Sequence, residues 1–208
     1  MDTATFWNQI ATYNQTTWLV QALMIIVAAY LTYRVFTQPG PRIDGWMKAF
    51  LALAFAWDGI VFFLVFVRSP ISMFSGVPLF IITSALFVVD IFVRKTHFKL
   101  PEGGWTRGFT IVWVLLAALY PLIGWPLGHT WPKVLLPLFP CPLTVFAIAL
   151  VAAATPRTDK KVFIVLLPWA LMGLPKCFGV LDCYEDCILF ASGVYGLIVL
   201  IKNWKLIK

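Results

Sequence analysis

Long apolar runs, joined by short polar segments, dominate the chain and restrict what it can fold into. A helix needs about 20 mostly apolar residues to cross the hydrocarbon core of a bilayer. Charged residues make up only 12% of the 208 residues, whereas a soluble domain carries about 25%. The runs therefore predict an all-α integral membrane protein, with little chain left for a soluble domain.

We expect one polytopic transmembrane domain over residues 1–208, folded as a seven-helix bundle. Its predicted spans are residues 18–36, 47–67, 77–93, 109–125, 134–154, 162–176 and 187–202. The sixth span is the weakest, because it is short and contains Pro168. Residues 1–17 are polar and have no basic segment before an apolar core, so no signal peptide is predicted.

Lysine and arginine predict the orientation, because cytoplasmic loops carry an excess of both. With seven spans, thirteen of the sixteen lysines and arginines fall on one side of the membrane, namely Arg34, Arg42, Lys48, Arg94, Lys95, Lys99, Arg107, Arg157, Lys160, Lys161, Lys202, Lys205 and Lys208. We therefore expect an outside N-terminus and a cytoplasmic C-terminus in the plasma membrane. The net charge of +7 then reflects loops beside anionic lipid, and no nucleic-acid partner is expected.

Cys141 lies between Pro140 and Pro142 in the apolar stretch LFPCPLTVF, and six of the fourteen prolines fall within residues 121–142. Proline breaks a helix interior but is accepted at the first helical position. One interpretation is a proline-broken fifth helix that begins at Pro142, with Cys141 as its N-cap and residues 131–140 entering the membrane as non-helical chain. The other is a proline-kinked helix in which the Cys141 thiol only packs.

The segment KCFGVLDCYEDC, before the last span, is the densest polar cluster. It supplies three thiols and three carboxylates, from Cys177, Cys183, Cys187, Asp182, Glu185 and Asp186. Besides free thiols without a special role, one interpretation is a disulfide among these three cysteines. A pairing of Cys177 with either of the other two is easier, since cysteines four apart on a helix lie near the upper limit of bridging distance. The other is a soft or borderline metal ion bound by these six residues with His129 and Cys141, although the cysteine spacing matches no zinc signature.

Two carboxylates fall inside predicted spans. Asp58, beside Trp57, lies near the middle of the second span, where an ionisable group is costly and indicates a functional site. We expect Asp58 to face the bundle interior as a ligand for a proton or a cation. Asp90 lies nearer the cytoplasmic end of its span, and we expect it to pair with Arg94 one turn later.

Three short motifs carry a resemblance to a known group of proteins. Tyr13 and Asn14 precede the first span, GHTWP occupies residues 128–132, and PCPLTVF occupies residues 140–146. In this order they resemble a bacterial family of small seven-helix membrane proteins of unassigned function. The resemblance covers most of the chain and implies the same fold and a location in the bacterial inner membrane. It implies no activity.

Sequence motifs for most enzymes and cofactors are absent. The chain has no H-E-x-x-H, G-x-S-x-G or Walker sequence, no haem signature, and no lysine in the middle of the last span to hold retinal. The leading hypothesis is therefore a protein that binds and transports a small solute or soft metal ion through a site on the outer face. The residues expected to bind the solute are Asp58, Trp57, Cys141, His129, Tyr13 and Asn14.

Two alternatives remain at this stage. One is a membrane-embedded enzyme that acts on a lipid or a small molecule, with Cys141 as nucleophile and His129 as base; catalysis is less favoured than transport. The other is an interaction subunit with no chemistry of its own. The sequence leaves self-association open.

Overall fold

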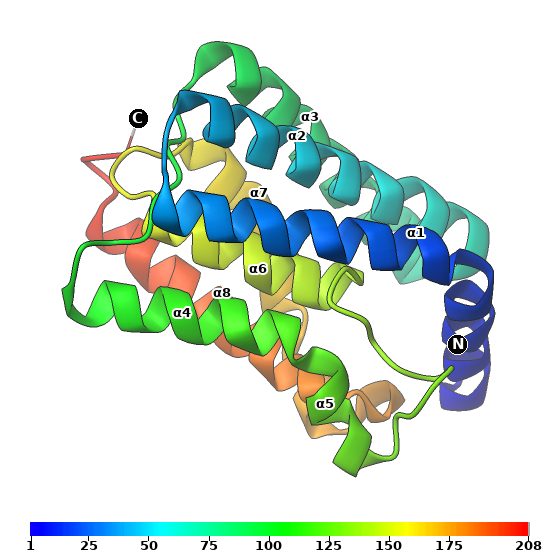
Figure 1. Cartoon of the computed structure of the whole chain (residues 1–208). Coiled ribbons are helices and arrows are strands. Elements are labelled where there is room, and N and C mark those ends of the chain that lie inside the picture. The colour runs from blue at the N-terminus through cyan, green and yellow to red at the C-terminus, as the bar shows by residue number, and fades with distance from the viewer. Residues whose placement is uncertain (208) are drawn as a thin grey trace.

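The computed structural model describes residues 1–207, which form an all-helical bundle without a β-strand in that range (Figure 1). The α-helices are α1 (Thr3–Thr37), α2 (Pro41–Trp57), α3 (Val77–Val93), α4 (Gly104–Ala118), α5 (Tyr120–Gly124), α6 (Pro140–Ala153), α7 (Lys160–Leu171) and α8 (Cys187–Lys202). Two π-helices, η1 (Asp58–Phe66) and η2 (Ser72–Gly76), follow α2 and precede α3. Short 3-10 turns are η3 (Trp125–Leu127), η4 (Leu174–Phe178), η5 (Val180–Asp182) and η6 (Tyr184–Asp186). Lys208, one of the basic residues counted above, lies outside the described residues.

Five helical stretches are long and apolar enough to cross a membrane. They are Thr3–Thr37, Pro41–Phe66, Ser72–Val93, Lys160–Phe178 and Tyr184–Lys202. A sixth candidate combines α4 with the stretch Tyr120–Leu127, from which it is bent by 65°. The helix α6 is also apolar, but with 14 residues it is shorter than a span.

The helix edges differ from the predicted edges mainly where caps and prolines lie. The polar residues before the first predicted span are helical, because Asp2 caps α1 and its carboxylate accepts from the N–H of Thr5 at 2.8 Å. The predicted span 109–125 breaks after Ala118, just before Pro121. The predicted span 134–154 is helical only from Pro140. The last predicted span, 187–202, coincides with α8.

The helix α6 is the core of the bundle. All of its residues are buried, and it packs against α4, α7 and α8 (Figure 1). A helix that is apolar on every side must be surrounded by protein or lipid, and here other helices surround it. The helix α1, in contrast, exposes apolar side chains such as Leu19, Leu23 and Ile26 to the outside of the bundle.

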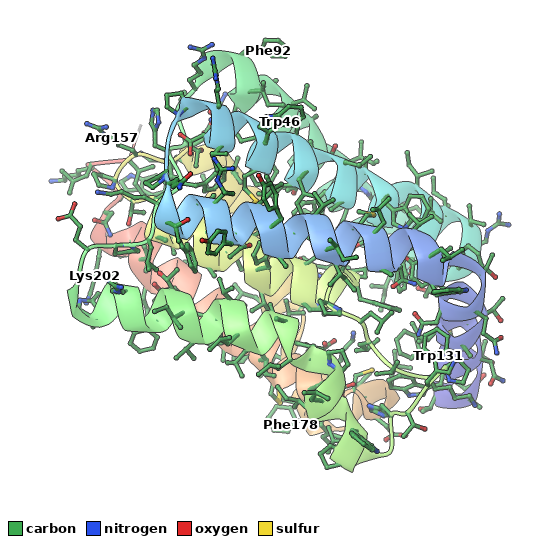
Figure 2. All side chains as sticks on the ribbon, viewed as in Figure 1. Trp46, Phe92, Trp131, Arg157, Phe178 and Lys202 are labelled. Carbon is green, nitrogen blue, oxygen red and sulfur yellow. A yellow bond between two sulfur atoms is a disulfide. The ribbon has the colours of Figure 1, made fainter. Side chains whose placement is uncertain are left out.

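The two ends of the bundle differ in charge. Of the thirteen lysines and arginines that the sequence places on one side, the twelve that the structure describes lie at one end of the bundle, which we call the basic end. At this end α1, α3 and α8 finish and α2, α4 and α7 begin. Arg157 and Lys202 mark this end in Figure 2. The N-terminus lies at the opposite end, and the C-terminal segment lies at the basic end (Figure 1).

Asp90 pairs with Lys48 and not, as predicted, with Arg94. The Lys48 Nζ lies 3.2 Å from Asp90 Oδ2 and donates to the Asp90 carbonyl at 3.1 Å, and both side chains are buried. The backbone N–H groups of Lys95 and Thr96 also donate to the Asp90 carboxylate. The prediction was wrong because α3 ends at Arg94, whose φ of 58° is left-handed, so the helical spacing that the prediction assumed is lost.

Candidate binding site

The local fold around Cys141 follows from its prolines. Residues 128–139 are non-helical, and α6 begins at Pro140 with Phe139 as its N-cap. Proline is suited to this position because its fixed φ matches the helix and its missing N–H has no helical partner to lose. A short, proline-initiated helix is therefore correct, but it starts two residues earlier than predicted. Cys141 is its second residue and not its N-cap.

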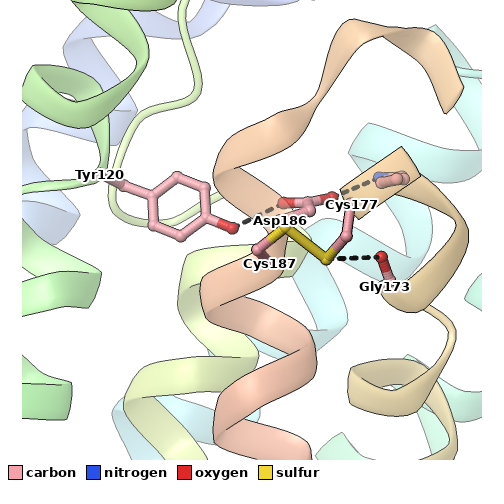
Figure 3. Close-up of a disulfide and its surroundings, with 6 residues drawn as sticks. Tyr120, Gly173, Cys177, Asp186 and Cys187 are labelled. Carbon is pink, nitrogen blue, oxygen red and sulfur yellow. Dashed lines mark hydrogen bonds and ion pairs between the residues drawn. A yellow bond between two sulfur atoms is a disulfide. The ribbon is translucent and has the colours of Figure 1, made fainter. Parts of the chain in front are cut away.

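The thiol of Cys141 belongs to a buried polar network built on Asp186. The thiol donates to Asp186 Oδ2 at 3.1 Å, and the Tyr120 hydroxyl donates to Oδ1 at 2.6 Å. The Lys176 ammonium donates to Asp186 Oδ2 at 2.5 Å and lies 3.8 Å from the Cys141 sulfur. Figure 3 shows the Tyr120 ring pointing at the Asp186 carboxylate. We call these four residues, from α5, α6, η4 and η6, the Asp186 network.

His129 lies next to this network but bonds to a different carboxylate. Its Nδ1 is 2.8 Å from Glu185 Oε1, and its ring stacks on the Trp7 indole at a centroid distance of 3.9 Å. Gly124 fits against this pair, where a Cβ would lie 3.3 Å from Glu185 Oε1. No hydrogen bond joins His129 to Cys141 among the described residues. The proposed pairing of His129 as base with the Cys141 thiol therefore has no geometric support.

A disulfide joins Cys177 to Cys187 and fixes the turns η4–η6 to the start of α8 (Figure 3). This is one of the two pairings that the sequence favoured. Cys141 and Cys183 are free and buried. Burial raises the pKa of the Cys183 thiol, which keeps it neutral near pH 7.

A cavity of about 520 Å³ lies next to the Asp186 network, at the end of the bundle opposite the basic end, and Cys141 and Lys176 of the network line it. Its wall is mostly apolar and comes from η1, the 135–141 segment, α7 and η5, with Phe62, Phe63, Leu135, Phe139, Trp169 and Leu181 among its side chains. Cys141, Lys176, Ser69 and Ser72 supply its polar positions. We call it the thiol cavity.

Asp58 and Trp57 lie apart from the thiol cavity and do not line it. Asp58 is fully buried, and neither carboxylate oxygen has a hydrogen-bond partner among residues 1–207. The Trp57 Nε1 donates to the Tyr13 hydroxyl at 2.8 Å. The Tyr13 ring packs edge-on against Phe62 and Phe139, two side chains of the cavity wall. Tyr13 therefore stands behind the cavity wall.

Asn14, predicted to bind a solute, instead holds the chain that leads into α6. Its Nδ2 donates to the carbonyls of Pro132 and Val134 at 2.7 and 2.8 Å. Gln21 donates to the Asn14 Oδ1 at 3.2 Å. Buried backbone carbonyls outside regular structure need such partners, and the Asn14 amide nitrogen supplies them to the non-helical segment.

The predicted metal ligands do not converge. Cys177 and Cys187 are bonded to each other, Cys183 is a buried neutral thiol, and Asp182 is exposed. In residues 1–207, no group of three or more His, Cys, Asp or Glu side chains is placed to hold a metal ion.

Tyr120 and Lys176 belong to the site although the sequence interpretation did not select them. A signal for Lys176 was present, since it is one of three basic residues on the sparsely charged side and begins the acidic segment. Tyr120 offered no such signal, because its contact with Asp186 depends on how α5 packs against η6.

A family model described as "Family of unknown function (DUF6064)" matches residues 3–207. This agrees with the expectation of a family without assigned function. No curated protein and no solved structure matches the chain significantly.

Proposed function

The chain belongs to the family of unknown function DUF6064, and from its own geometry we propose that it is a multi-pass membrane protein that binds a small, mostly apolar solute in the thiol cavity as a step in transport. The observation that carries this proposal is the cavity itself, with an apolar wall and Lys176 and Cys141 at its polar end.

The charge asymmetry supports an outside N-terminus and a cytoplasmic basic end. Seven crossings result if the bent α4–α5 pair counts as one span and α6 crosses together with its non-helical lead-in. Such non-helical chain is tolerated in a membrane only where protein covers it. Residues 134–139 of the lead-in are covered, and Asn14 bonds to the carbonyls of Pro132 and Val134. A green fluorescent protein fused to the C-terminus should then fluoresce in bacterial cells. A dark C-terminal fusion and an active periplasmic reporter at the same position would reverse this topology.

The size and chemistry of the thiol cavity define the class of solute. Ligand sites of about 300–1,000 Å³ enclose small organic molecules and are mostly apolar with a few polar groups. The wall of aromatic and aliphatic side chains suits an apolar body. The Lys176 ammonium has three donors, and Asp186 takes one of them. A carboxylate or another hydrogen-bond acceptor at one end of the solute would therefore bind at Lys176.

A metal ion fits this cavity poorly. The disulfide removes two of the predicted thiolate ligands, and the Lys176 ammonium lies 3.8 Å from the Cys141 sulfur. A fixed positive charge at that distance opposes a bound cation. We therefore assign the cavity to an organic solute.

Binding can be measured with dansyl-undecanoic acid, which has an apolar body and a carboxylate, on protein in lipid nanodiscs. Energy transfer from tryptophan to the dansyl group should saturate, because Trp169 is in the cavity wall. Leu181→Trp, which fills the cavity, should weaken binding about tenfold or more. Leu23→Trp, at an exposed apolar position of α1, is the matched control. Equal binding by the two variants would rule out the cavity as the site.

A second function, covalent chemistry at Cys141, is favoured by one observation. The thiol is in the cavity and 3.1 Å from a carboxylate that is placed to accept its proton. An N-alkyl maleimide should then add to the Cys141 sulfur faster than to Cys183, the other free buried thiol. Mass spectrometry of the wild type, Cys141→Ser and Cys183→Ser distinguishes the two sites. Comparable rates at both cysteines would leave only the binding function.

A further inference from the structure

A second pocket, of about 590 Å³, lies at the basic end between the first turns of α2 and the end of α3. Its charged or titratable side chains are Arg42, Asp44, Lys48, Arg94 and His97. We call it the arginine pocket. It lies far along the bundle from the thiol cavity, and the proposed function makes no use of it.

The ion pairs inside this pocket leave two arginines uncompensated. Asp44 accepts from the Phe98 N–H at 2.9 Å and contacts His97 Nδ1 at 3.1 Å. Lys48 forms a buried ion pair with Asp90. Neither Arg42 nor Arg94 forms an ion pair or a hydrogen bond with another side chain among the described residues. Even when the Asp44 carboxylate is counted against one of them, the two exposed guanidinium groups leave the lining of the pocket with a net positive charge.

The backbone conformation places Arg94 in this position. Arg94 adopts a left-handed φ of 58° where α3 ends, a conformation that is uncommon for residues other than glycine. The turn brings the N–H groups of Lys95 and Thr96 onto Asp90. Arg94 therefore lies just past the end of α3 and lines the pocket together with Arg42.

Large, exposed aromatic side chains lie at the pocket and next to it. Trp46, on α2, lines the pocket and is 66% exposed, and Phe92, on α3, is 79% exposed. Figure 2 shows Phe92 at the outer edge of α3 and labels Trp46 on the neighbouring α2. Exposed aromatic residues at the end of apolar helices are typical of the membrane interface. A charged pocket beside them matches a lipid whose headgroup enters the pocket while its acyl chains lie along α2 and α3.

We infer that the arginine pocket binds the phosphate group of an anionic phospholipid between Arg42 and Arg94. Guanidinium groups bind phosphate oxygens with paired, charge-assisted hydrogen bonds. Basic pockets between membrane helices on the cytoplasmic side bind lipid headgroups in this way. The same chemistry would accept a free phosphate ester, so the experiment compares the two sources.

The test uses native mass spectrometry of the whole protein with phosphatidylglycerol, phosphatidylcholine or glycerol phosphate as probes. Wild-type protein should retain phosphatidylglycerol more strongly than phosphatidylcholine. Arg42→Gln with Arg94→Gln should weaken phosphatidylglycerol binding about a hundredfold, since each arginine loses a charge-assisted hydrogen bond to the phosphate that contributes about tenfold. The control, Arg107→Gln with Lys205→Gln, removes the same charge from the same end of the bundle and should bind as the wild type does.

Thermal unfolding followed by tryptophan fluorescence checks that both double variants are folded. Retention of the diacyl lipid without binding of glycerol phosphate identifies the lipid as ligand. Saturable glycerol phosphate binding that depends on Arg42 and Arg94 identifies a soluble phosphate ester in the same site. Equal phosphatidylglycerol binding by the two double variants would overturn the inference.

Discussion

Asp186 and Asp58 are both completely buried in the same bundle, yet their surroundings are opposite. Asp186 receives hydrogen bonds from a thiol, a phenol and an ammonium group, whereas Asp58 has no partner among the described residues. A buried charge is tolerated when it is paired and hydrogen-bonded. Burial alone therefore does not define a functional carboxylate: Asp186 is bound into the structure, whereas Asp58, which the sequence predicts to bind a proton or a cation, has no bonded partner in the described chain.

Asp186→Asn tests the hydrogen-bonded Asp186 network and should cause the largest loss in the free energy of unfolding. It leaves the Lys176 ammonium without its counter-ion, and breaking a buried pair in this way costs about 3–5 kcal/mol. The free energy of unfolding, measured in detergent by tryptophan fluorescence, should fall by this amount. The double variant Lys176→Met with Asp186→Leu should recover part of the loss, because no buried charge remains. If the double variant is less stable than Asp186→Asn, the ion pair is not the source of the effect.

Removing the disulfide tests whether the Asp186 region is held by its covalent bond as well as by its polar contacts. Cys177→Ser with Cys187→Ser opens a loop whose ends are 10 residues apart. The expected loss of stability is about 2–4 kcal/mol. Reductant should lower the unfolding temperature of the wild type and leave that of the variant unchanged. The expectation would be contradicted if the wild type, unfolded and refolded in reductant, kept the unfolding temperature that it has without reductant.

Tyr13→Phe tests the region around Asp58, where we expect a smaller change in the free energy of unfolding. The change removes the acceptor of the Trp57 N–H but keeps the ring that packs on Phe62 and Phe139. One unpaired buried donor costs about 1–2 kcal/mol. Trp113→Phe, which removes a buried indole N–H that has no partner in the described chain, serves as a control for the loss of a polar group. A Tyr13→Phe variant as stable as the wild type would show that the Trp57 N–H finds another acceptor.

Asp58→Asn should have the smallest effect on stability, less than the roughly 1 kcal/mol that a typical hydrogen bond contributes. The carboxyl group has no hydrogen bond to lose, and the amide has nearly the same size. Transport of the solute in reconstituted vesicles should fall if Asp58 binds a proton or a cation during the cycle. A loss of stability as large as that of Asp186→Asn would show that Asp58 has a partner and that the two regions are alike.

The sequence predicted the helical, apolar fold well, because each helix there depends on local composition and on prolines and caps. The last span was predicted to the residue, and the grouping of prolines placed the start of α6 within two residues. Cys177 was correctly favoured as one partner of a disulfide. The predictions about ligands remain predictions, and the structure adds only where the residues lie: Asn14 bonds to backbone carbonyls, Asp58 does not line the cavity of Cys141, and His129 bonds to Glu185.

The sequence by itself therefore determined the apolar helices and the charge difference between the two ends, and it offered the break before α6 as one of two interpretations. These properties follow from the local chain and from its solvent. Only the tertiary structure decided which buried charges meet. Asp186 accepts hydrogen bonds from Tyr120 on α5 and Cys141 on α6. Asp90 forms its ion pair with Lys48 on α2 and not with Arg94. Such contacts depend on how separate helices pack, and no spacing along the chain specifies that packing.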